Sequence, residues 1–195
     1  MTFLFLLLIL AGTAAGVWFQ GLWSGVVTLV NLLLAMMIAT SFYEPAVAAI
    51  EGIGAAKSYT YLLDFVVLWL LFGFTFAVLR AIGDSLSKKT VGFDTPVEMA
   101  GRSILALWCG WLMVCFVAFS LHMAPLNSVN PLGAFSKPTA KTMGPVSPDR
   151  LWIGFMHSRS KGAFGGNVFD ANYDFPLRYH DRRAKYSAEG TSLRF

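Results

Sequence analysis

The feature that most constrains this chain is a pair of long apolar segments separated by a single polar turn. Residues 2–19 carry no charge, Gln20 and Gly21 interrupt the run, and residues 22–42 are again uncharged. A membrane-spanning helix needs about 20 mostly apolar residues, whereas a soluble domain needs charge to cover its surface. One helix through both segments would exceed the thickness of a bilayer. The pattern therefore predicts two helices in an antiparallel hairpin.

Two further apolar segments follow, at 61–79 and 103–123. The second is preceded by Thr95-Pro96-Val97-Glu98, a capping-box pattern that predicts a helix start near Pro96. Charged side chains before Arg80 are confined to Glu44, Glu51, Lys57 and Asp64. We therefore expect an all-α membrane protein, with about four transmembrane helices in a compact bundle over residues 1–123. Pro45 should end the second helix, because proline lacks an amide donor and disfavours helix at the preceding residue.

The composition changes after Met123. Residues 124–195 form a Pro/Gly-rich polar tail that carries ten of the fifteen Lys and Arg residues. We expect this tail to be mostly irregular, and residues 163–195 to be extended or disordered. One short amphipathic helix is predicted at about 148–161, with an apolar face made by Leu151, Trp152, Phe155 and Met156. That face suits contact with a membrane surface; packing on the protein itself, packing on a partner, and disorder are the alternatives.

The distribution of cations between the loops predicts the orientation in the membrane. The loop 80–102 carries Arg80, Lys88, Lys89 and Arg102, whereas the loop 43–60 carries only Lys57. Short loops rich in Lys and Arg face the cytoplasm. With four spans, both termini should then face outward, which for a bacterial inner membrane would be the periplasm.

Small residues recur at spacings that allow helices to approach closely. The expected helix-packing positions are Gly12, Gly16, Gly21, Gly25, Gly101 and Gly110. Helices in lipid associate by close backbone approach, so such residues mark interfaces. These interfaces serve either packing within the bundle or a homo-oligomer.

No catalytic motif, phosphate-binding loop or metal-ligand spacing is evident, so we expect a protein that is not an enzyme and has no cofactor. The basic tail lacks the folded polar scaffold of a nucleic-acid-binding domain. Asp64 lies one turn inside the third apolar segment and has two interpretations. Its side chain either reaches the membrane interface or is a buried functional acid, since intramembrane carboxylates are costly.

Residues 1–123 resemble the colicin V production protein family of bacterial inner-membrane proteins. The resemblance rests on spaced glycines in the first hairpin, small residues late in the second helix, an amphipathic stretch after the third, and a glycine-containing entry to the fourth. The residues concerned are Gly16, Gly21, Gly25, Ala35, Ala39, Asp94, Gly101 and Gly110. The chain departs from the family pattern at Gln20, where arginine is common, and at Leu105, where the second of two glycines four apart is common.

The resemblance implies a small multi-pass inner-membrane protein without known catalysis, linked to toxin production or export and to envelope maintenance. The alternatives are a small channel or transporter, and an accessory subunit of a larger membrane complex. The expected partners are the lipid bilayer and either a second copy of the chain or a membrane-complex partner, but no nucleic acid.

Overall fold

The computed structural model confirms an all-α architecture. It describes residues 2–52, 60–86, 94–124, 143, 146–161 and 168–188, so the Pro-rich connector at 125–142 and the end of the tail lie outside the described residues. The helices are α1 (Thr2–Trp18), α2 (Leu22–Gly52), α3 (Thr60–Leu86), α4 (Thr95–Met123), α5 (Pro148–Ser160) and α6 (Phe175–Ala188).

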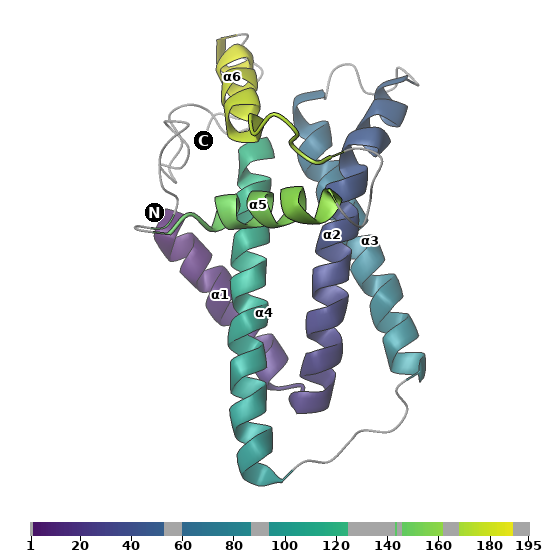
Figure 1. Cartoon of the computed structure of the whole chain (residues 1–195), viewed down its shortest axis with the longest axis vertical. Helices are drawn as coiled ribbons and strands as arrows, with labels where there is room; N and C mark the ends of the chain where they lie inside the picture. The colour runs from purple at the N-terminus through teal and green to yellow at the C-terminus, as the bar shows by residue number, and fades with distance from the viewer. Residues whose placement is uncertain are drawn as a thin grey trace.

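Three of these helices, α2, α3 and α4, are long and apolar enough to cross a membrane, and α1 is a shorter apolar helix of 17 residues. The chain is therefore a membrane protein. In Figure 1, α4 and most of α2 run upright, α3 slants across α2, and α1 slants against α4. The end of α1, the start of α2, the end of α3 and the start of α4 all lie at the lower end, so successive helices are antiparallel.

The second and third helices are longer than the sequence predicts. α2 passes through Pro45 and ends at Gly52, because the loss of one helical hydrogen bond is offset by good helix formers and by burial of Val47 in the core. α3 continues beyond residue 79 to Leu86, which makes the amphipathic stretch at 80–86 part of the same helix. α4 begins at Thr95 with Pro96 in its first turn, so the predicted start near Pro96 is confirmed. The capping box itself does not form: the N-cap is Asp94, which makes no side-chain cap hydrogen bond, and Oε1 of Glu98 instead accepts from the backbone amide of Leu22.

The closest helix approach involves Gly110 of α4 and the backbone of α1. A Cβ atom placed on Gly110 would lie 2.8 Å from the carbonyl oxygen of Leu10. Real side chains do not tolerate this distance, so only glycine allows α1 to pack here. A Cβ atom placed on Gly101 of α4 would lie 2.6 Å from Cδ1 of Leu22, which is the end of a flexible side chain and not backbone.

The hairpin glycines differ in their roles. Gly21 has φ +86° at the turn between α1 and α2, a conformation that favours glycine. Gly25 packs at ordinary distance against Leu105. Gly12 and Gly16 do not pack within the bundle: among the described residues, a Cβ on either would meet nothing within 4 Å. For these two glycines the homo-oligomer interface stays a prediction. Both glycines lie on the exposed side of α1, because its other side is turned toward α4.

An aromatic cluster joins α3, α4 and α5 in the core. Phe116 of α4 lies 5.0 Å from Phe72, 5.6 Å from Trp69 and 5.9 Å from Trp152, measured between ring centroids. Such tilted and edge-to-face contacts add to the gain from burying the rings. α5 is thereby held across the bundle, as Figure 1 shows, instead of lying apart from it.

Candidate functional site

The prediction that residues 163–195 are extended or disordered is wrong where α6 forms. The Oδ1 atom of Asp170 accepts hydrogen bonds from the backbone amides of Asp174 and Phe175, at 2.9 and 3.0 Å. These bonds satisfy amide donors at the helix start, which otherwise lack partners. Phe175 and Tyr179, one turn apart on the same face, are both buried. Phe175 stacks on Phe119 of α4 at 5.0 Å between centroids, which anchors α6 on the bundle.

The face of α6 that points to α2 and α3 also carries polar groups, and they meet Asp64. This carboxylate of α3 is only 6% exposed. Its Oδ2 atom accepts a 2.8 Å hydrogen bond from the hydroxyl of Tyr179 and a second one from Nη1 of Arg182. Of the two interpretations of Asp64, the structure therefore shows the buried acid. The charge is tolerated because a cation and a hydroxyl donor both compensate it.

Glu44 of α2 makes the second contact with α6. Its Oε1 atom accepts hydrogen bonds of 2.9 Å from Nη2 of Arg178 and from the hydroxyl of Tyr43. About half of each side chain in the Glu44–Arg178 pair is exposed. Water screens such a pair, so it contributes less stability than the buried contact at Asp64.

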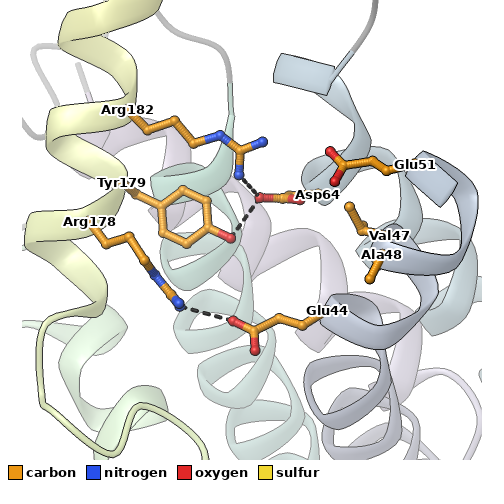
Figure 2. Close-up of a pocket in the computed structure, with 8 residues that line it drawn as sticks. All are labelled: Glu44, Val47, Ala48, Glu51, Asp64, Arg178, Tyr179 and Arg182. Atoms are coloured by element: carbon orange, nitrogen blue, oxygen red, sulfur yellow. Dashed lines mark hydrogen bonds and ion pairs between the residues drawn. The ribbon is translucent and has the colours of Figure 1, made fainter. Parts of the chain in front are cut away.

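A cavity of about 180 Å³ lies among these groups. Its polar lining consists of three carboxylates from α2 and α3, with Tyr179 and two arginines from α6, and Figure 2 shows the arginines reaching toward the acids. The lining residues are Glu44, Val47, Ala48, Glu51, Asp64, Arg178, Tyr179 and Arg182. Burial, and next the charge of Asp64, raise the pKa of Tyr179 far above its usual range, so its hydroxyl remains a donor.

A second buried polar pair fixes α5. Nε2 of His122, near the end of α4, lies 2.9 Å from Oδ2 of Asp149 in the first turn of α5, and both side chains are buried. Trp152 then donates a hydrogen bond of 3.2 Å from Nε1 to the hydroxyl oxygen of Thr40 in α2. These two contacts tie α5 to α4 and α2.

This arrangement corrects the predicted membrane contact of α5. Trp152 is 2% exposed and Met156 is fully buried, while Phe155 packs partly against the core. Only Leu151, at 52% exposure, remains on the outside. The apolar face of α5 packs on the protein's own bundle, where Trp152 contacts the ring of Phe116.

Arg80 organises a separate polar cluster at the lower end of the bundle. Its guanidinium donates to the hydroxyls of Thr28 at 2.8 Å and Ser24 at 3.2 Å, and to Oε1 of Gln20 at 3.2 Å. Asp84 on the next turn of α3 completes the cluster at 3.1 Å. This cluster connects α3 to the hairpin of α1 and α2.

In the part of the chain that the structure describes, no group of three or more His, Cys, Asp or Glu side chains is placed to hold a metal ion. Instead, Asp64 pairs with Arg182 and Glu44 pairs with Arg178. α6 is the element that sequence reasoning missed, although Phe175 with Tyr179 and Arg178 with Arg182 both recur at helical spacing. Comparison with protein-family models, with curated proteins and with solved structures finds no match for this chain.

Proposed function

We propose that this chain is a non-enzymatic multi-pass protein of a bacterial inner membrane that supports toxin production or export, or maintenance of the envelope. The function class comes from the resemblance of residues 1–123 to colicin V production proteins. The structural observation that carries the accessory role is the docking of α5 and α6 on the bundle. Buried contacts at Asp64 and His122 hold these helices in place.

The docked helices also present apolar side chains on the outside. Tyr173 is 66% exposed and Leu177 is 51% exposed, both close to the start of α6. They belong to the C-terminal segment and not to a spanning helix. Exposed apolar groups on a polar face are typical of surfaces that bind another protein. This supports a protein that works by holding a partner against the membrane bundle.

Affinity purification of the full chain in mild detergent, with partners identified by mass spectrometry, tests this function. A Tyr173→Ser/Leu177→Ser double variant should lose the partners that the unaltered chain retains. A Glu51→Gln variant, altered at an exposed acid on α2, serves as the control and should keep them. An identical partner set for both variants would contradict the accessory role of this surface.

The second candidate is a small channel or transporter, and Asn31 favours it. This residue is buried in the apolar part of α2, and among the described residues its amide nitrogen has no hydrogen-bond partner. Polar groups inside a membrane usually face a bundle interior or a water-filled path. Ion flux into liposomes that contain the purified protein, lowered in an Asn31→Leu variant, would support this candidate over the first.

A further inference from the structure

A second and larger cavity lies between α2 and the described residues Ser160, Val168 and Phe169. Its volume is about 590 Å³, within the range of small-molecule sites. Ser41, Phe42, Glu44, Pro45 and Ala48 line it from α2, and Phe169 lines it from the other side. Glu44 also lines the smaller cavity, so its carboxylate lies between the two.

The position of this cavity along α2 limits what can enter it. The helix is uncharged from Leu22 to Tyr43, and Glu44 is its first charged residue. In a spanning helix, that transition marks the level where hydrocarbon gives way to lipid headgroups. Phe42, at the cavity, is 53% exposed and offers an apolar surface at this level. Membrane amphiphiles are therefore the molecules best placed to reach the cavity.

The polar lining on α2 is rich in acceptors. Both hydrogen bonds that the described residues donate to Glu44 end on Oε1, which leaves Oε2 as an acceptor. In Figure 2 this second oxygen points away from Arg178. Among the described lining residues, Glu44 is the charged one, and its ion-pair partner Arg178 lines the smaller cavity instead of this one.

Two more acceptors come from the turn before Glu44. Pro45 has no amide hydrogen, so the carbonyl of Ser41 lacks its usual helical donor. The hydroxyl oxygen of Ser41 adds a third acceptor. Ser41 and Glu44 are three residues apart in one helix and so share a face. Their three acceptors match the three N–H donors of a primary ammonium group.

We propose that this cavity binds the headgroup of a membrane lipid with a primary ammonium group, of which phosphatidylethanolamine is the example to test. The ammonium donates to Glu44 and Ser41, and the apolar part of the lipid lies against Phe42, Ala48 and Phe169. A quaternary ammonium lacks N–H donors, and phosphatidylglycerol lacks the cation that pairs with Glu44. The site therefore selects phosphatidylethanolamine over phosphatidylcholine and phosphatidylglycerol.

Native mass spectrometry of the full chain, released from micelles with equal amounts of the three lipids, measures this selectivity. Phosphatidylethanolamine should be retained about tenfold more than phosphatidylcholine, the ratio expected from one charge-assisted hydrogen bond. Glu44→Gln should abolish the preference. Because the Glu44–Arg178 pair is half exposed, that variant should still fold.

Arg178→Gln is the matched control, since it breaks the same ion pair but keeps the carboxylate. It should preserve the preference for phosphatidylethanolamine. Ala48→Phe, which fills the cavity, should lower retention of that lipid without altering Glu44. Equal retention of the three lipids by the unaltered chain, or equal loss of preference in the Glu44 and Arg178 variants, would overturn the proposal.

Discussion

The hydroxyl of Tyr179 donates a 2.8 Å hydrogen bond to the buried carboxylate of Asp64, which precedes it by 115 residues in the chain. Arg182, one turn further along α6, binds the same oxygen. An acid that would be costly alone in a membrane bundle thus becomes the point where the C-terminal helix attaches. The docking of α6 therefore depends on Asp64 of α3.

Asp64→Asn tests this dependence. The substitution leaves Arg182 without its buried counter-charge, and we expect a loss of about 2–3 kcal/mol in the free energy of unfolding. Thermal unfolding in detergent measures the loss, and protease sensitivity of α6 should rise with it. Glu51→Gln is the control: Glu51 lines the same cavity but is exposed, so its change should cost less than about 0.5 kcal/mol. Similar losses in both variants would show that Asp64 stabilises the docking of α6 no more than an exposed acid does.

The contact of Gly110 with Leu10 leads to a second prediction. A methyl group at Gly110 would lie 2.8 Å from a backbone carbonyl, so Gly110→Ala should push α1 from α4 and destabilise the protein by about 1–3 kcal/mol. Gly12→Ala, in the same helix pair, meets nothing within 4 Å and should be neutral or slightly stabilising, because alanine favours helix. The midpoint of thermal unfolding should be lower for Gly110→Ala than for Gly12→Ala. A lower midpoint for Gly12→Ala would contradict the packing of α1 on α4.

Local signals are sufficient to predict the bundle. Pro96 indicates the start of α4, and the apolar runs indicate where the long helices lie, although α2 and α3 extend beyond those runs. The extension of α2 through Pro45 is less visible, because a local rule about proline competes with burial of Val47. Tertiary contacts determine that the helix continues through Pro45, and a short stretch of sequence does not reveal those contacts.

α6 is not predicted from the sequence for the same reason: contacts with residues far away in the sequence stabilise this helix. Its neighbourhood is rich in Gly, Asn and Arg, which is typical of irregular segments. The helix is stabilised by Phe119 of α4 and by Asp64 of α3, both far away in sequence. The pairing of Asp64 with a tail arginine was likewise not predictable, since several basic residues of the tail were equally available.

The burial of Trp152 gives a third prediction. Its ring packs on Phe116, and its Nε1 donates to Thr40, so Trp152→Ala should cost about 3–5 kcal/mol of stability. Leu151 is its exposed neighbour, and Leu151→Ala should cost less than about 1 kcal/mol. Chemical unfolding followed by circular dichroism distinguishes the two. Membrane-surface binding by α5 would instead make both substitutions mild for stability and harmful for vesicle binding.

The orientation of the bundle is the last prediction. Arg80 lies in the last turns of α3 and Arg102 in the first turns of α4, on either side of the loop that contains Lys88 and Lys89 in the sequence. The positive-inside rule places that end in the cytoplasm. The opposite end, where α4 finishes and α6 docks, then faces outward. Alkaline phosphatase fused after Phe195 should therefore be active, and a fluorescent protein that folds only in the cytoplasm should remain dark there.

The same two reporters inserted after Lys89 provide the control and should behave in the opposite way. A fluorescent fusion after Phe195 would reverse the orientation. In that case the tail would lie in the cytoplasm, and its ten of the fifteen Lys and Arg residues would determine the orientation. Glu44 and its lipid cavity would then lie at the inner leaflet, and the lipids offered to the site would be those of that leaflet.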